Sequence, residues 1–146
     1  MAPINTFSPG ENSNSASRKA EKFLNDNATR PGVTVTESGL QFEVPAEGPA
    51  DGASPTDADL VVAHYRGTLI DGTEFDSSYA RGEPAEFALA RVIRGWTEGL
   101  QLMSEGDKFR FVVPSNLAYG EPGRPDSPIG PNEALVFEVE LIEVKE

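Results

Sequence analysis

Residues 92–103, VIRGWTEGLQLM, contain the only tryptophan of the 146-residue chain, Trp96. Ile93 and Leu100 lie three positions before it and four after it, so the three side chains share one face of a helix. The spacing predicts an amphipathic helix over residues 94–103. Two interpretations of the tryptophan remain open at this point. Its ring either fills an ordinary core or forms part of a pocket.

Strand-like segments surround this helix. They cover residues 38–44, 60–69, 73–78, 82–89, 107–114 and 134–145. In the first of them, alternation places Leu40 and Phe42 toward the core and Gln41 toward water. Asp71-Gly72 predicts a tight turn, and short links of this kind favour antiparallel pairing. The predicted fold class is α+β, with a sheet of five or six antiparallel strands wrapped around one short central helix.

The N-terminal part of the chain has a different composition. Residues 1–14 are rich in Ser, Asn, Pro and Gly, which predicts a disordered tail. Ala20 and Leu24 follow at helical spacing, so residues 15–33 are predicted to form a short helix and a linker. The folded domain is then expected over residues 34–146.

Composition and charge exclude several classes of function. A formal net charge of −12 disfavours binding to nucleic acid and to anionic membranes. The absence of cysteine excludes disulfides, zinc–thiolate sites and cysteine nucleophiles. Neither a signal-peptide core nor an apolar run of the roughly 20 residues that span a bilayer is present. We therefore expect a cytoplasmic protein, or a periplasmic one if a signal region has been trimmed from it.

Motifs of common polar chemistry are missing. The one histidine, His64, falls mid-strand and is expected to point away from the covered face. The acidic loop 51–59 resembles a calcium loop but has Val62 where an EF-hand carries its last glutamate. Glu74 and Asp76 should share a strand face, yet no sign of a sugar-sized cleft accompanies them. The sequence predicts no metal and no cofactor.

Aromatic residues, in contrast, come from many separate elements. They are Tyr65, Phe75, Phe87, Trp96, Tyr119 and Phe137. A concave site lined by rings with few ionisable groups suits an apolar ligand.

Three segments together resemble a known family. They are AHYRGTLIDGTEFDSSYARGEP (63–84), VIRGWTEGLQLMSEGDKFRFVVPSNLAYG (92–120) and PIGPNEALVFEVELIEV (128–144). In this order they resemble the FK506-binding-protein (FKBP) type of peptidyl-prolyl cis-trans isomerase, most closely its bacterial macrophage infectivity potentiator (Mip-like) branch. The resemblance runs from about Thr34 to the end of the chain. It implies a half-barrel of antiparallel strands around a short helix, in agreement with the pattern above.

The resemblance also implies the residues of the site. The catalytic set would be Tyr65, Phe75, Asp76, Tyr119 and Phe137. The residues that bind substrate or inhibitor would be Arg81, Val92, Ile93, Trp96 and Ile129. Trp96 would be the floor under the proline ring, and the Ile93 N–H and the Tyr119 hydroxyl would hold substrate carbonyls. The chain departs from many members at Ala85, where they carry a phenylalanine.

The function implied is isomerisation of X–Pro bonds during protein folding, by non-covalent stabilisation of the twisted amide. Expected partners are proline-containing polypeptides and macrolide inhibitors of the FK506 or rapamycin type. The alternative is a non-catalytic peptide-binding or chaperone module on the same fold. Because only a short helix precedes the domain, the sequence predicts a monomer.

Overall fold

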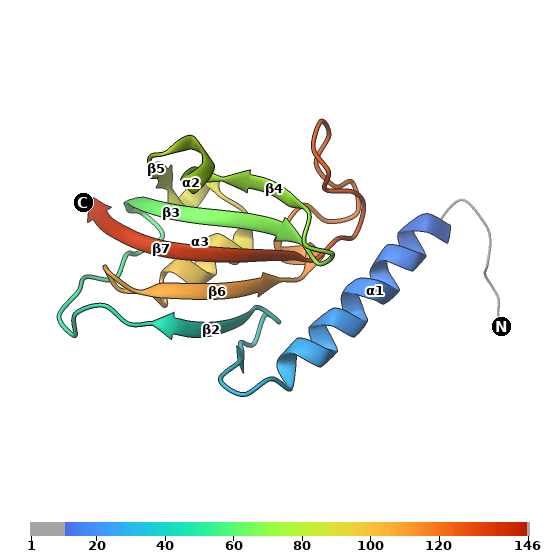
Figure 1. Cartoon of the computed structure of the whole chain (residues 1–146), viewed down its shortest axis with the longest axis horizontal. Coiled ribbons are helices and arrows are strands. Elements are labelled where there is room, and N and C mark those ends of the chain that lie inside the picture. Colours follow the sequence, from blue (N-terminus) through green and yellow to red (C-terminus); the bar gives the residue numbers. More distant parts are fainter. Residues whose placement is uncertain (1–10, 146) are drawn as a thin grey trace.

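A computed structural model describes residues 11–145, and its centre is one twisted antiparallel sheet (Figure 1). The strands are β1 (Thr34–Val35), β2 (Gln41–Ala46), β3 (Leu60–Leu69), β4 (Glu74–Ser77), β5 (Ala85–Ala88), β6 (Lys108–Val113) and β7 (Leu135–Lys145). Their order is β1-β2-β6-β7-β3-β4, with β5 also paired to β3. The predicted α+β class is confirmed. The described residues form seven strands instead of five or six, and the strand that the pattern missed is the two-residue β1.

The inner face of the sheet is covered by the short helix α3 (Arg94–Leu100). Fully buried side chains from the central strands meet it, among them Val61, Phe111, Leu135, Val139 and Leu141. Two glycines on α3 allow the close approach. A Cβ atom on Gly95 would lie 2.5 Å from Val113 Cγ1, and one on Gly99 would lie 2.6 Å from Phe111 Cε1. Packing this tight leaves no room for a methyl group.

Helix α3 ends at Leu100, three residues before the predicted end at Met103. The amides of Leu102 and Met103 bond to carbonyls three residues back, at 2.9 and 3.1 Å. The chain then turns into β6, because Gly106 N–H donates to the Leu141 carbonyl at 2.8 Å. Met103 still reaches the core and is fully buried.

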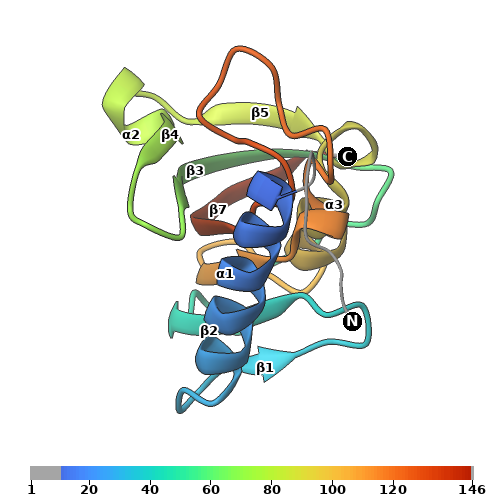
Figure 2. The same ribbon diagram turned by 90° about the vertical axis from the view of Figure 1, so that its right-hand side faces the viewer.

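The outer face is covered near β2 by the longer helix α1 (Glu11–Ala28), which lies beside the ends of the strands (Figures 1 and 2). It begins at Glu11, four residues before the predicted start, so residues 11–14 are helical rather than part of a disordered tail. The rest of the predicted tail, residues 1–10, lies outside the described residues.

Helix α1 also changes the environment of Gln41. Alternation placed this side chain in water, but it is only 5% exposed. Asn27 Nδ2 donates to Gln41 Oε1 at 2.7 Å, and Gln41 Nε2 donates to the Leu24 carbonyl at 2.9 Å. The prediction for Gln41 was wrong because a helix distant in sequence covers this end of the outer face.

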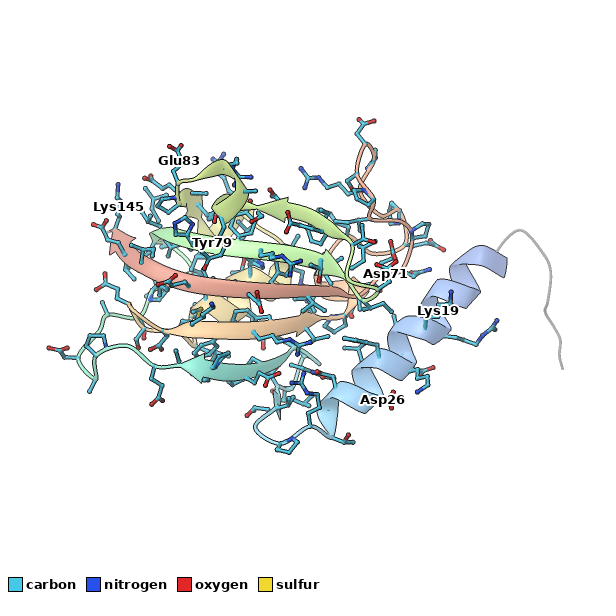
Figure 3. All side chains as sticks on the ribbon, viewed as in Figure 1. Lys19, Asp26, Asp71, Tyr79, Glu83 and Lys145 are labelled. Carbon is cyan, nitrogen blue, oxygen red and sulfur yellow. The ribbon has the colours of Figure 1, made fainter. Side chains whose placement is uncertain are left out.

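The turn between β3 and β4 forms as predicted. Gly72 has a left-handed φ of 92°, and its N–H donates to the Leu69 carbonyl at 3.0 Å. Asp71, labelled at this turn in Figure 3, accepts the Thr73 N–H at 2.9 Å. This hydrogen bond holds the pKa of the Asp71 carboxyl below its ordinary value.

Three short helical turns connect the strands. They are α2 (Ser78–Arg81), η1 (Leu89–Arg91) and η2 (Ser115–Leu117). The first replaces the end of the strand predicted over residues 73–78. The Ser77 hydroxyl accepts the Ala80 N–H at 3.2 Å, and Gly82 ends the turn with φ 81°. In the described part of the chain, no helix has the length and apolar character needed to cross a membrane.

Candidate functional site

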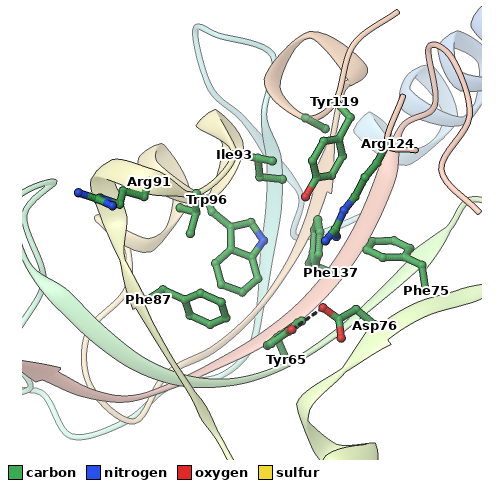
Figure 4. A pocket seen from close by; sticks show the side chains of 12 residues that line it. Tyr65, Phe75, Asp76, Phe87, Arg91, Ile93, Trp96, Tyr119, Arg124 and Phe137 are labelled. Atoms are coloured by element: carbon green, nitrogen blue, oxygen red, sulfur yellow. Dashed lines mark hydrogen bonds between the residues drawn. The ribbon is translucent and has the colours of Figure 1, made fainter. Parts of the chain in front are cut away.

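A cavity of about 450 Å³ opens on the inner face of the sheet (Figure 4). Its walls come from β3, β4, β5, β7, the start of α3 and the loop after β6. The lining residues are Tyr65, Phe75, Asp76, Phe87, Arg91, Val92, Ile93, Trp96, Ala118, Tyr119, Arg124 and Phe137. Eight of the ten predicted site residues are therefore brought together here, and the exceptions are Arg81 and Ile129.

Trp96 lies at the bottom of the cavity and is 4% exposed. Three rings meet it edge-on, with centroid distances of 5.2 Å to Tyr65, 5.0 Å to Phe87 and 5.4 Å to Phe137. Phe75 meets Phe137 in the same way at 5.6 Å. Edge-to-face contacts are favourable for aromatic pairs, so the rings hold one another in place. The Trp96 indole nitrogen is buried and has no hydrogen-bond partner among the described residues.

A β-bulge in β4 directs two neighbouring side chains into the pocket. Gly67 pairs with Asp76 and Thr68 pairs with Glu74, which leaves Phe75 as an extra residue on β4. Phe75 and Asp76 therefore both line the cavity. The prediction that Glu74 and Asp76 share a face was wrong, since alternation assumes a regular strand. Glu74 instead accepts a hydrogen bond from Arg66 Nε at 2.7 Å on the exposed side.

Gly67 provides the space for two of the rings. A Cβ atom at this position would lie 2.6 Å from Phe75 Cζ and 2.8 Å from Phe137 Cε1. Only a residue without a side chain lets both rings lie over the strand. A glycine inside a strand is the one sequence signal that indicates such an approach.

Asp76 is held by two donors at the edge of the pocket. The Tyr65 hydroxyl donates to Asp76 Oδ2 at 2.5 Å, and Arg81 donates to Asp76 Oδ1 at 2.6 Å. Arg81 also donates to the Tyr65 hydroxyl at 3.0 Å. Arg81, predicted to bind substrate or inhibitor, thus reaches the site through Asp76 and Tyr65 and does not line the cavity itself.

These contacts determine the protonation of the pair. Burial raises the pKa of the Asp76 carboxyl, but the hydrogen bonds from Tyr65 and Arg81 and the charge of Arg81 outweigh it, so the pKa lies below its ordinary value. Burial, followed by the hydrogen bond to Asp76, raises the pKa of the Tyr65 phenol. At neutral pH the site therefore contains an ionised carboxylate and a neutral phenol.

Ile129 has a structural position. It is 3% exposed, and its carbonyl accepts the Arg124 N–H at 3.0 Å inside the loop after β6. It supports the loop that carries Arg124 rather than lining the cavity. Arg91, Ala118 and Arg124 line it without having been predicted, because they lie on irregular segments where no periodicity places a side chain.

His64 lies on the opposite face of the sheet, as predicted. Its Nδ1 is 2.8 Å from the Ser78 hydroxyl, and its ring stacks on Tyr79 with centroids 4.6 Å apart (Figure 3). The Ser78 hydroxyl is fully buried and also accepts the Tyr65 N–H at 2.7 Å. The contact between histidine and serine is therefore structural.

Comparisons with known proteins agree with this geometry. Residues 52–142 match the family described as FKBP-type peptidyl-prolyl cis-trans isomerase, and residues 8–44 match the domain amino terminal to FKBP-type peptidyl-prolyl isomerase. FkpA of Aeromonas hydrophila is 54% identical over 128 residues, covering 88% of this chain and 46% of that protein. The FKBP-type 22 kDa isomerase of Escherichia coli is 55% identical over 123 residues, covering 84% and 58%.

A third relative, named outer membrane protein MIP of Legionella longbeachae, is 49% identical over 127 residues, covering 87% of this chain and 53% of that protein. The chain thus spans about half the length of the curated relatives it matches. The crystal structure of FkpA from Escherichia coli superposes with a TM-score of 0.87 at 45% identity, covering 92% of this chain and 62% of that one. The crystal structure of a peptidyl-prolyl cis-trans isomerase from Pseudomonas syringae superposes with a TM-score of 0.84 at 37% identity. The match covers 97% of this chain and 100% of that one.

Proposed function

The chain belongs to the FKBP-type peptidyl-prolyl cis-trans isomerase family, and from this premise we propose that it accelerates rotation about X–Pro peptide bonds. The relatives named MIP or Mip agree with the predicted branch. The observation that carries the proposal is the buried Trp96 ring, enclosed edge-on by Tyr65, Phe87 and Phe137 at the bottom of an open cavity.

Such a pocket suits a reaction in which no bond is broken. Rotation about a peptide bond has a barrier of about 18–20 kcal/mol because the C–N bond is partly double. The twisted state has lost its amide resonance and is less polar than the planar one. Contacts stronger in the twisted state than in the planar state lower the barrier, so a water-poor cavity lined by rings favours rotation.

Two hydrogen-bond donors are available for the carbonyls on either side of the proline. The Ile93 N–H makes no hydrogen bond with any described residue, and the Tyr119 side chain lies at the cavity (Figure 4). We assign both to substrate carbonyls and Trp96 to the proline ring. Asp76 would keep Tyr65 and Arg81 in position at the edge of the site.

NMR exchange spectroscopy on a Leu-Pro peptide tests the activity with the full chain. Micromolar protein should increase the exchange rate well above its uncatalysed value, which corresponds to tens to hundreds of seconds. Phe137→Ala should be much slower, and Tyr65→Phe should have a milder effect. Phe42→Ala is the matched control. The Phe42 ring lies outside the cavity lining and stacks on the Phe109 ring, with the two ring centroids 5.4 Å apart. A wild-type chain that produces no acceleration would overturn the proposal.

The relatives are named as isomerases, so the non-catalytic alternative is not favoured. FK506-type macrolides are expected to compete for the same cavity. Ala85 packs against the core and does not line the cavity, so its small size should affect inhibitor binding indirectly. Inhibition of exchange by such a macrolide, measured on the wild type and on Ala85→Phe, checks this expectation.

Location, boundaries and assembly follow as separate proposals. The expected cytoplasmic location finds no support among the relatives, one of which is named an outer membrane protein, so we favour the alternative outside the cytoplasm. Fractionation of the native host tests this location.

We retain residues 34–146 as the isomerase unit and residues 15–33 as the preceding helix and linker. The chain is proposed to be a monomer, which predicts a mass near 15.7 kDa in light scattering.

A further inference from the structure

Two arginine side chains line the cavity beside the rings. The Arg124 guanidinium lies 5.6 Å from the centroid of the Tyr119 ring and is directed toward the cavity, whereas Arg91 lies on the other side of Trp96 with its guanidinium directed away from the rings (Figure 4). Neither lies within 4.0 Å of a carboxylate of the described residues, although six of the twelve Lys and Arg side chains do. The cavity is therefore flanked by cations that the protein itself does not neutralise.

A neighbouring groove continues this pattern. It has a volume of about 610 Å³ and shares Val92 with the first cavity. Arg94 lines it and also has no carboxylate within 4.0 Å among the described residues. Among the described residues that line the groove, Glu98 is the one carboxylate, and it accepts a hydrogen bond from Ser38 at 2.5 Å. A polypeptide that leaves the cavity over Val92 thus enters a groove lined by Arg94.

The carboxylate at the cavity already has partners within the protein. Asp76 is the only carboxylate that lines it, and Arg81 and Tyr65 bind both of its oxygens. The whole chain carries a formal net charge of −12. Salt screens charges that lie beyond a Debye length of about 8 Å at physiological ionic strength. A bound peptide, by contrast, lies within contact distance of the arginines.

We propose that, among prolyl peptides that differ only in the charge of one side chain within two residues of the proline, this site prefers a carboxylate over an ammonium group. The inference rests on the proposed function and specifies its substrate class. An extended chain advances about 3.3–3.6 Å per residue, so a side chain one or two residues away lies near the edge of the cavity. Guanidinium groups bind carboxylates in a bidentate manner, which makes arginine suited to select acidic neighbours.

Two series of capped peptides test the preference, acetyl-Ala-Xaa-Pro-Ala-Ala-amide and acetyl-Ala-Ala-Pro-Xaa-Ala-amide, with Glu, Gln or Lys at Xaa. NMR exchange avoids a coupling protease that has its own charge preference. We expect kcat/KM for Glu to exceed that for Lys by roughly three- to tenfold at about 0.15 M salt, where the Debye length is about 8 Å, and the ratio to fall below about two at about 1 M salt. Arg124→Gln and Arg91→Gln should each lower the ratio in one of the two series.

The ratio is taken within each variant, so a general loss of activity cancels. Arg18→Gln, on α1, removes the same charge outside the cavity lining and should leave the ratio unchanged. A Leu-Pro peptide separates the two proposals. If it is accelerated but Glu and Lys peptides differ by less than twofold in both series, the inference is wrong and the proposed function stands. If no peptide is accelerated, both are overturned.

Discussion

The two longest helices pack against the sheet in opposite ways. Helix α3 has seven residues and lies on the inner face through Gly95, Trp96, Gly99 and Leu100, all of them buried. Helix α1 has eighteen residues and contacts the outer face near β2 through a polar pair, Asn27 and Gln41. The shorter helix thus carries the core and the pocket floor, while the longer one adds a polar cover. The length of a helix therefore does not indicate how much of the core it forms in this protein.

The largest effect is expected on the inner face. Leu100 is fully buried in the main core, so Leu100→Ala should lower the free energy of unfolding by about 3 kcal/mol. Leu102 belongs to the same stretch but is 45% exposed, and Leu102→Ala should cost less than about 0.5 kcal/mol. Urea unfolding of both variants gives the comparison. Equal losses would contradict the assigned packing.

The next largest effect is expected for Gly67→Ala, which should change both the packing of the rings and the activity of the site. The added methyl group would meet Phe75 and Phe137 at under 3 Å, so the rings must move. Overpacking of this kind costs about 1–3 kcal/mol, and the shifted rings should also lower isomerase activity. Unfolding and exchange measurements on one preparation test both effects. Unchanged activity would mean that the positions of these rings do not matter for the reaction.

The polar contact of α1 is expected to contribute less. Asn27→Ala should cost about 1–2 kcal/mol, because the buried Gln41 amide loses one partner and Arg30 and Arg110 each lose the Asn27 Oδ1 acceptor. Activity should not change, since the pair lies on the face opposite the pocket. Replacing Asn27 and Gln41 by leucine should recover part of the loss, because no amide is then left unpaired and Arg30 and Arg110 still bind Glu43. A double variant as unstable as Asn27→Ala would show that packing, rather than the unpaired amide, determines the cost.

The smallest effect concerns pH. The pKa of Asp76 is lowered in the folded state, so its ionisation stabilises the fold above the unfolded pKa of about 3.9, and this stabilisation is lost as pH falls through the folded value. The stability difference between wild type and Asp76→Asn should be constant above about pH 5 and shrink below about pH 4. A difference independent of pH down to pH 2 would contradict the lowered pKa.

Sequence patterns predicted the elements whose two faces differ in polarity. Alternation predicted β6 and β7 as strands with one apolar face, and this face is buried through Phe109, Phe111, Phe137 and Val139. Alternation failed where another element decides the environment. Gln41 is buried by a helix that starts thirty residues earlier, which no local pattern contains.

The sequence predicted the site residues that belong to family motifs or carry aromatic rings. Eight of its ten predicted residues line the cavity, and Arg81 reaches it through Asp76. The bulge that turns Phe75 and Asp76 inward depends on the register with β3, and register is a property of the paired strands. Arg124 comes from an irregular loop, so its position over Tyr119 required the structure.

The central claim is that a proline ring rests on Trp96 at the inner face. Because the chain contains one tryptophan, its fluorescence reports on this pocket alone. Titration with a Leu-Pro peptide should give a saturable change in emission, and Phe137→Ala should weaken the apparent affinity, whereas Phe42→Ala should not. Unchanged emission at a peptide concentration that saturates catalysis would contradict the account.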